Sequence, residues 1–542
     1  MQQFLGAPRA IVDDILTGTA QLMPLLQSTP ESGARIVLRA QRDPAQVAVL
    51  SGGGSGHEPS HAGFVGKGML SGAIAGELFA SPGVEAVLAA IRACADAPGV
   101  LLVIKNYTGD RLNFGLAAER ARAEGIDVAT VLVADDIALP DAKQPRGLAG
   151  TVLVHKFVGD LAAQGLPLAE IAQRGQAFAD RLLSLGMALS SCTVPGQTQG
   201  KRSPELGLGI HNEPGARTID PQDVEDALEL VLAPLLDAAD AKYGAGARLV
   251  VMLNDLGGCS TQELGTLTRG MLARIGVERI ALMPRPAALM TSMDMHGFSV
   301  TLAPADDDVL AALRAPVETL GWPGVVEPHA VKQFTPVLSR QGAEPGGGQR
   351  DAARGAALGR LAEVLIQAEA ELNALDARTG DGDAGSTFAN GARALADALA
   401  QDRLSTGEDA ALATELAALI EHSMGGSSGV LLSILFTTAA TTLERGEGWP
   451  AALAAGIARM QDYGGAREGD RTMLDALIPA IQALDGGTLA DAINAARSGA
   501  DGTAQMTRAG AGRSAAVPED ALRGVVDPGA EAVSRAFAAY AG

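Results

Sequence analysis

The feature that most constrains this chain is a change of sequence pattern near residue 340. Before that point, short β-branched runs alternate with stretches of helical periodicity, whereas beyond it the periodicity is helical almost throughout. A chain of 542 residues is also too long for one compact core, so two or three domains are expected. The pattern therefore predicts two parts with different architectures.

The N-terminal part has the pattern of a covered α/β sheet. Its apolar runs lead into Gly, Asn or Asp, as strands that are buried on both faces do. These runs are 46–53, 99–107, 127–135 and 248–255. Helical patterns at 84–94 and 114–125 lie between them. Alternation of this kind predicts an α/β fold with a largely parallel sheet.

A second α/β sub-domain is expected to begin near residue 185, where the sequence predicts a helix over 178–189. This start implies two sub-domains, about 1–184 and 185–338. Segment 339–352 is polar and rich in glycine, which predicts a flexible linker. Apolar residues recur at spacings of three and four over 353–542, so this last part is predicted to be all-α, without strands.

Charge and cysteine content exclude several classes of protein. The net charge is 42 − 63 = −21, which argues against nucleic acid or an anionic membrane as a partner. The three cysteines form no CxxC pair, so neither a disulfide framework nor a zinc site is expected. The N-terminus has no signal-peptide pattern, and no apolar run of about 18 uncharged residues predicts a membrane span. These features indicate a cytoplasmic protein.

Three carboxylates fall within eight residues of the helical part. Asp376, Asp381 and Asp383 lie where a helix over 355–375 is expected to end in a Gly-hinged turn. Clustered carboxylates are hard oxygen ligands, which suit Mg²⁺ or Ca²⁺ and not zinc. An EF-hand does not fit, because the twelfth position counted from Asp381 is Ala392 and not Glu. The alternative is a solvated acidic turn that caps the next helix.

Two further features of the helical part suit phosphate groups. Ser386 and Thr387 are predicted at a helix N-terminus, where amides and hydroxyls favour anions. The Gly-Gly-Ser-Ser-Gly segment 425–429 precedes a strongly apolar helix, and its glycines allow backbone N–H groups to approach an anion. A simple helix start would explain the same segment. Neither it nor the N-terminal SGGGSGHEP has the ending of a Walker loop.

The N-terminal part places polar side chains directly after its strands. His57 follows the strand predicted at 46–50, Asp110 follows the one at 100–105, and His211 follows a shorter apolar run. Loops at the carboxyl edge of an α/β sheet are where such folds bind ligands. A His/Asp group there can act as a general base on a hydroxyl. The alternative for any one of these histidines is a structural role.

Several long motifs, in the same order, give the chain a resemblance to one family. In the first part they are GGGSGHEPSHAGFVGKGML, ELFASP, NYTGDRLNFG, GIHNEPG and MTSMDMHGFS. In the second part they are LDARTGDGDAG, MGGSSG, GDRTMLDAL and DPGA. The chain thus resembles the single-chain, ATP-dependent dihydroxyacetone kinases over nearly its whole length. The resemblance implies an α/β substrate domain, an antiparallel helical barrel that binds nucleotide, and a homodimer that is possibly domain-swapped.

The resemblance also implies roles for individual residues of the first part. His211 matches the histidine that adds to the substrate carbonyl as a hemiaminal, which suits a neutral imidazole. Asp110 matches the base near the attacking hydroxyl, and His57 matches its hydrogen-bonding neighbour. The positions that match the lining of the substrate pocket are Gly54, Ser81 and Lys105.

In the second part, Asp376, Asp381 and Asp383 match aspartates that hold two Mg²⁺ bridging the nucleotide phosphates. The predicted nucleotide-binding residues are Ser386, Thr387, Gly426, Ser427, Ser428 and Arg513. Two departures from the family stand nearby. Ala384 replaces a common His or Cys, and GRSAA at 512–516 replaces Gly-Arg-Ala-Ser-Tyr.

Three functions remain open at this level. The first is phosphorylation of dihydroxyacetone to dihydroxyacetone phosphate with ATP and Mg²⁺. The second is a kinase for a related short carbonyl sugar, glyceraldehyde or erythrulose. The third is a ligand-binding regulator without activity, against which the retained Asp110, His57 and three aspartates count. Some members of the family split FAD to a cyclic FMN, so this side activity stays open as well.

Overall fold

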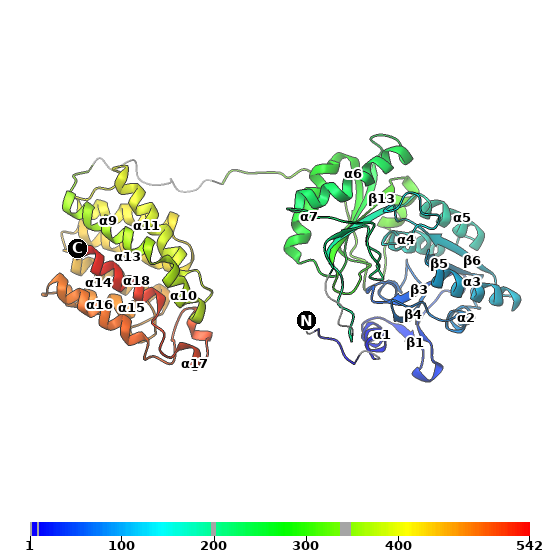
Figure 1. Ribbon diagram of the computed structural model, residues 1–542, viewed down its shortest axis with the longest axis horizontal. Coiled ribbons are helices and arrows are strands. Elements are labelled where there is room, and N and C mark those ends of the chain that lie inside the picture. The colour runs from blue at the N-terminus through cyan, green and yellow to red at the C-terminus, as the bar shows by residue number, and fades with distance from the viewer. Residues whose placement is uncertain (1–2, 8–9, 197–201, 337–347, 542) are drawn as a thin grey trace. The chain divides into compact units, whose positions relative to one another are not determined.

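The computed structural model describes residues 3–7, 10–196, 202–336 and 348–541. By its internal contacts the chain divides into two compact units, Met1–Gln333 and Phe334–Gly542 (Figure 1). The first unit is α/β and the second is helical, which confirms the predicted fold class. Residues 339–347 of the predicted linker lie outside the described residues.

The first sheet of the α/β unit has the strand order β1-β2-β4-β3-β5-β6. Its strands are β1 (Leu25–Gln27), β2 (Arg35–Arg39), β3 (Ala48–Ser55), β4 (Gly72–Leu78), β5 (Val100–Lys105) and β6 (Val128–Val133). Strands β4, β3, β5 and β6 run parallel, so their carboxyl ends share one edge. The predicted strands at 46–53, 99–107 and 127–135 are β3, β5 and β6.

Helices cover both faces of this sheet, which is why its strands are apolar on both sides. On one face, Leu102 of β5 packs with α2 (Val84–Arg92) and α3 (Thr108–Ala123). On the other, Val103 packs with α4 (Gly150–Ala163) and α5 (Leu168–Ala179). Helix α1 (Ile11–Leu22) contributes Val12 and Leu16 to this second core.

The second sheet has the strand order β14-β11-β10-β13-β7-β8-β9, with β12 paired to β10. Its strands are β7 (Leu183–Ser190), β8 (Glu205–Leu206), β9 (Arg217–Thr218), β10 (Leu249–Asp255), β11 (Ile280–Pro284), β12 (Ala287–Ala288), β13 (His296–Pro304) and β14 (Val325–Val326). Helices α6 (Val224–Tyr243) and α7 (Thr261–Ile275) pack on one face. Helix α8 (Asp307–Arg314) joins the core around α4.

The prediction of a helix over 178–189 is wrong. Helix α5 ends at Ala179 and strand β7 begins at Leu183. Leu183, Leu185 and Met187 alternate into the core beneath α6 and α7, while β7 pairs antiparallel with β13. The leucines of this segment fit a helical and an alternating period equally well, and pairing with β13 selects the strand.

The second unit is helical throughout its described residues, with no strand among them. Its helices are α9 (Ala352–Gln367), α10 (Glu369–Thr379), α11 (Ala384–Ala400), α12 (Asp409–Ser423), α13 (Gly426–Glu444), α14 (Trp449–Gly464), α15 (Leu474–Leu484), α16 (Leu489–Thr503), α17 (Glu519–Leu522) and α18 (Pro528–Ala541). The helix predicted over 355–375 is in fact two, because α9 ends at Gln367 and α10 begins at Glu369.

Helix α13 is the one helix among the described residues that is long and apolar enough to cross a membrane by length and composition. The sequence predicts no membrane span, and length and composition do not distinguish a span from the core helix of a protein. One-third of the window is buried, however, and α13 packs against α12 and α14 as part of the helical core. Apolar composition of this kind is also typical of a core helix.

Candidate functional site

The carboxyl edge of the first sheet carries the predicted site of the α/β unit. His57 follows β3, Ser81 follows β4, and Asp110 follows β5. The sequence predicts Asp110 on a loop after its strand, but Asp110 lies in the first turn of α3. Helix α3 begins at Thr108, two residues before Asp110. It therefore holds the carboxylate on a rigid element.

The loop that contains His57 is fastened to the second sheet. The backbone N–H of Thr291 donates to the carbonyl of His57 (3.2 Å), and the N–H of Met293 donates to that of Gly56 (2.8 Å). His57 Nδ1 lies 2.8 Å from the carbonyl oxygen of Thr291. Segment 290–299, which the sequence marks only as a motif, therefore positions His57.

This contact determines the chemistry of His57. A carbonyl oxygen can only accept, so Nδ1 carries the proton and Nε2 carries the lone pair. Burial, together with the nearby His211, lowers the pKa of His57 well below its usual value, so the ring is neutral at pH 7. Nε2 is buried and has no hydrogen-bond partner among the residues that the structure describes, which leaves it as an acceptor for a ligand.

His211 lies beside His57, with 4.8 Å between the ring centroids. The rings of His211 and Tyr107 are perpendicular, with 4.3 Å between their centroids, and the His211 side chain is 15% exposed. Glu213 closes the turn by accepting from the His211 N–H at 2.8 Å. Tyr107 and Glu213 are not among the residues predicted from the sequence, although they lie in the motifs NYTGDRLNFG and GIHNEPG.

Asp110 and Lys105 approach one point of the site from two sides. A Cβ built on Gly53 would lie 2.6 Å from Lys105 Nζ and 3.4 Å from Asp110 Oδ2. Gly53 has a φ of +156°, and no larger residue fits between these two groups. Asp110 Oδ2 and the Ser81 hydroxyl are buried without partners among the described residues. The edge thus combines the Lys105 ammonium with a carboxylate oxygen and a hydroxyl that have no hydrogen-bond partner among the described residues.

Gly54 lies where two segments of the backbone pass close to each other. A Cβ there would come within 2.7 Å of the backbone at Phe79 and Ala80, so this glycine lets β3 pass close to the segment after β4. This close approach packs the loop that carries His57 against that segment, and the predicted place of Gly54 in the lining of the substrate pocket stays a prediction.

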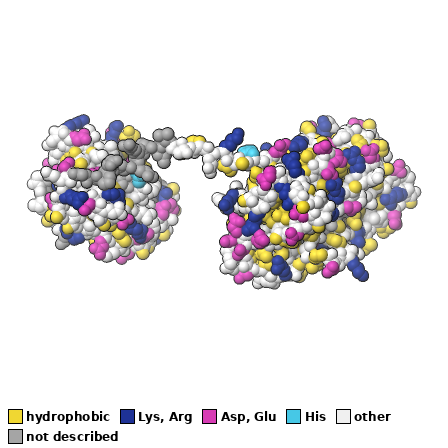
Figure 2. Space-filling model, turned by 90° about the horizontal axis from the view of Figure 1, so that it is seen from above, with side chains coloured by type: hydrophobic (Ala, Val, Ile, Leu, Met, Phe, Trp, Pro, Cys, Tyr) yellow, Lys and Arg dark blue, Asp and Glu magenta, His cyan; other side chains and the backbone are white. Residues whose placement is uncertain are grey.

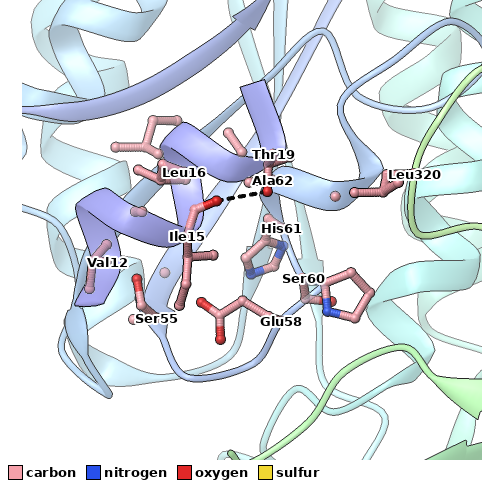
Figure 3. A pocket seen from close by; sticks show the side chains of 17 residues that line it. Val12, Ile15, Leu16, Thr19, Ser55, Glu58, Ser60, His61, Ala62 and Leu320 are labelled. Carbon is pink, nitrogen blue, oxygen red and sulfur yellow. Dashed lines mark hydrogen bonds between the residues drawn. The ribbon is translucent and has the colours of Figure 1, made fainter. Parts of the chain in front are cut away.

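A cavity of about 360 Å³ is lined in part by β3 and the same loop, including Gly53 and Gly54. Figure 3 shows Val12, Ile15 and Leu16 of α1 on one side and Glu58 and His61 on the other. Neither Asp110, Lys105 nor His211 lines it. Its polar side chains are hydrogen-bonded to protein groups, as Ser60 is to the carbonyl of Leu289, so the cavity is not the polar site described above.

The three aspartates of the helical unit form one cluster. One oxygen each from Asp376, Asp381 and Asp383 lies within 4.8 Å of the others. Asp376 is the buried member, and its Oδ2 accepts the N–H groups of Gly382 (2.9 Å), Asp383 (2.9 Å) and Ala384 (3.2 Å). These bonds close the turn between α10 and α11, and Gly382 in it has a φ of +84°.

Arg513 reaches the same cluster. Its guanidinium forms a hydrogen-bonded ion pair with Asp381 and lies 3.2 Å from Asp383, which raises the pKa of Arg513. A cation therefore already sits between the two exposed carboxylates. Three convergent carboxylates are the donor set that a hard divalent ion such as Mg²⁺ requires, so the residues fit this metal.

The predicted phosphate-binding groups are only partly available. The hydroxyl of Ser386 donates to Glu369 (3.0 Å) and accepts from Asn373 (3.0 Å), so it is engaged within the helical unit. Thr387 lies one turn into α11, with its N–H on the Asp383 carbonyl. Gly426 has a φ of +67° and open space around it, and Ser427 beside it is exposed while Ser428 is half-buried.

Comparison with known proteins covers both units. The Dak1 domain matches residues 17–321 and the DAK2 domain matches residues 378–542. The chain is 44% identical to dihydroxyacetone kinase of Citrobacter freundii, over 100% of this chain and 99% of that one. It is 39% identical to triokinase/FMN cyclase of Homo sapiens, over 98% and 97% of the two chains.

A crystal structure also resembles the fold. It is that of the dihydroxyacetone kinase from C. freundii in complex with AMP-PNP and Mg²⁺, with a TM-score of 0.75, 42% sequence identity and 99% of each chain covered. The site geometry, both domain matches and the full-length similarity agree. The chain is therefore a kinase of the dihydroxyacetone kinase family, as its motifs predict.

Proposed function

We propose that this protein transfers the γ-phosphoryl group of ATP to dihydroxyacetone and releases dihydroxyacetone phosphate. The observation that carries the proposal is the sheet edge at which His211, whose side chain is 15% exposed, lies beside His57, with two buried acceptors that have no partner among the described residues. These acceptors are His57 Nε2 and Asp110 Oδ2. Buried polar atoms are normally satisfied, so two orphaned acceptors at one sheet edge favour a ligand that brings hydroxyl groups.

A short ketone meets these requirements. One imidazole nitrogen of His211 adds to the carbonyl carbon while the C=O π bond breaks toward oxygen. The proton that the other ring nitrogen gives up ends on this oxygen, and a neutral hemiaminal results. A hydroxyl of the captured substrate then lies among Asp110, His57 and Lys105. Glycerol has no carbonyl for this addition, so covalent capture selects ketones and aldehydes.

Asp110 acts as the base in the transfer. As the substrate oxygen attacks the γ-phosphorus, its proton passes to the carboxylate, the bond to the β-phosphate oxygen breaks, and ADP leaves. His57 accepts a hydrogen bond at Nε2 and orients the hydroxyl. The buried cation Lys105 offsets the negative charge of the site.

In the helical unit, Asp376, Asp381 and Asp383 would hold Mg²⁺, which when bound supplies positive charge between the nucleotide phosphates. Ser386, Thr387, Gly426, Ser427 and Ser428 form the proposed phosphate-facing surface. Arg513 would exchange carboxylates for phosphate when the metal binds, because a guanidinium pairs with either.

The remaining expectations follow the same lines. We propose a cytoplasmic homodimer without a nucleic-acid or membrane partner. In Figure 2, Lys and Arg side chains are interspersed with Asp and Glu on the visible face of each unit. Mixed charge of this kind does not favour a polyanion.

A second candidate is a kinase for another triose, which the similarity to triokinase/FMN cyclase favours. A coupled assay of ADP release with dihydroxyacetone, glyceraldehyde, both erythruloses and glycerol decides between them, with FAD in a separate reaction to detect a cyclic FMN. Turnover highest with dihydroxyacetone and absent with glycerol is expected. Equal turnover with glycerol would exclude covalent capture, and no turnover with any sugar would exclude the proposed function.

A further inference from the structure

A row of buried polar side chains runs from the site into the core of the α/β unit. Lys105 Nζ lies 2.8 Å from His61 Nε2, and His61 Nδ1 lies 3.3 Å from Ser51 Oγ. His155 Nε2 of α4 approaches the same oxygen at 3.0 Å. All four side chains are buried. This row, Lys105–His61–Ser51–His155, has no part in the mechanism above beyond Lys105 itself.

The direction of each hydrogen bond in the row is determined by one carbonyl. Ser51 Oγ also lies 2.8 Å from the carbonyl oxygen of Val103, which can only accept, so the single hydroxyl proton is committed there. Ser51 must then accept from both imidazoles. His61 consequently carries its proton on Nδ1 and presents the lone pair of Nε2 to Lys105, so Lys105 is the donor.

Charge in the row is consistent with this direction. Burial and the neighbouring Lys105 lower the pKa of His61 well below its usual value, and the same causes lower the pKa of His155 to about 3. Both rings are therefore neutral at pH 7. Burial lowers the pKa of Lys105 and Asp110 opposes that shift, while His57 is a further titratable group that Lys105 influences.

We propose that His61 is a positioning residue for phosphoryl transfer, which accepts one N–H of Lys105 and so aims the ammonium at the space between Gly53 and Asp110. Lys105 would otherwise have no buried acceptor on that side, because no ion pair joins it to Asp110 among the described residues. With one N–H held by His61, the others remain for the substrate hydroxyl and the developing charge. The inference rests on the proposed function for its kinetic consequence only.

The first test needs no activity. In the protein labelled with ¹⁵N-histidine, long-range ¹H–¹⁵N spectra report which ring nitrogen is protonated, and His61→Gln assigns the signal. We expect a neutral ring with its proton on Nδ1 from pH 6 to 8. A proton on Nε2, or a charged ring, would overturn the proposal even if the enzyme is fully active.

The second test is kinetic and compares His61→Phe, which removes the acceptor, with His61→Gln, whose amide oxygen can accept from Lys105. We expect His61→Phe to lower kcat by about 10- to 100-fold, the value of a hydrogen bond to a charged group. The alkaline limb of its pH profile should move to lower pH, because the ammonium loses an acceptor. His61→Gln should restore most of the rate and return the alkaline limb of the pH profile to near its wild-type position.

His155→Phe is the matched control, because it is equally buried but does not touch Lys105. It should lower the melting temperature with a much smaller movement of the alkaline limb. If His61→Phe keeps the wild-type limb, or if His61→Gln is no better than His61→Phe, the role of His61 is packing and the proposal fails. If the wild type phosphorylates no sugar, the proposed function fails while the ¹⁵N result still decides the direction of the bond.

Discussion

The aspartate cluster of the helical unit allows metal binding and folding to be separated by mutation. Asp381 is exposed, and its side-chain contact among the described residues is the ion pair with exposed Arg513. Exposed pairs contribute little to stability, and removing one of three carboxylates relieves their repulsion. Asp381→Ala should therefore abolish ATP turnover through loss of Mg²⁺, while its stability stays close to that of the wild type.

Asp376→Ala should differ, because this carboxylate also accepts three backbone N–H groups of the turn. A hydrogen bond to a charged group is worth about 1.5–3 kcal/mol. Water can reach part of the turn and replace some of these hydrogen bonds. We therefore expect a loss of about 2–4 kcal/mol in the free energy of unfolding of the helical unit. Turnover should be lost as well.

The two tryptophans give a clean assay, because Trp322 lies in the first unit and Trp449 in the second. In a Trp322→Phe background, urea unfolding followed by Trp449 fluorescence reports the helical unit alone. Turnover and Mg²⁺-dependent ATP binding are measured on the same proteins. Wild-type turnover in Asp381→Ala would refute the metal assignment. Equal unfolding midpoints for the two variants would refute the role of Asp376 in the turn.

Three further predictions use other parts of the chain. His211→Ala should lose the mass shift that dihydroxyacetone adds to the wild type under mild native conditions, and its preference for ketone over glycerol should fall; an unchanged preference would place selectivity elsewhere. Burial raises the pKa of Asp527 to about 6 from an ordinary 3.8, so the protonated carboxyl stabilises the folded state. This stabilisation is fully present below about pH 4 and is lost as the pH rises through 6. The stability of the helical unit relative to Asp527→Asn should therefore fall by about 3 kcal/mol between pH 4 and 7, and a difference that is flat with pH in urea unfolding would contradict it. If the two units of different chains act together in a dimer, mixing His211→Ala with Asp381→Ala chains should recover up to half of the wild-type activity per dimer; with subunit exchange verified, no recovery would mean that each chain serves itself.

Much of the architecture could be predicted from local pattern. Apolar runs on both faces of β3, β5 and β6 indicate strands covered by helices, because side chains alternate along a strand and both sides must then be buried. The aspartate cluster could also be predicted from local sequence, since all three carboxylates lie within eight residues and one turn brings them together. Long motifs in a constant order also identified the family and, with it, candidate roles for His57, Asp110 and His211.

Local pattern failed where two structures satisfy it equally well. The leucines of 182–189 suit a helix as well as a strand, and only β13, more than a hundred residues away, decides for β7. Likewise, nothing local distinguishes Asp110 in a loop from Asp110 in the first turn of α3.

The chemistry of the site was decided by tertiary structure. The tautomer of His57 is set by Thr291, which lies 234 positions away in the sequence. Lys105 contacts His61 from a neighbouring strand. Arg513 contacts Asp381 across 132 positions. Sequence periodicity extends over a few residues and specifies which side of an element is buried. Which distant group completes a hydrogen bond depends on the order of strands in the sheets and on how the helices pack, and these are properties of the folded chain.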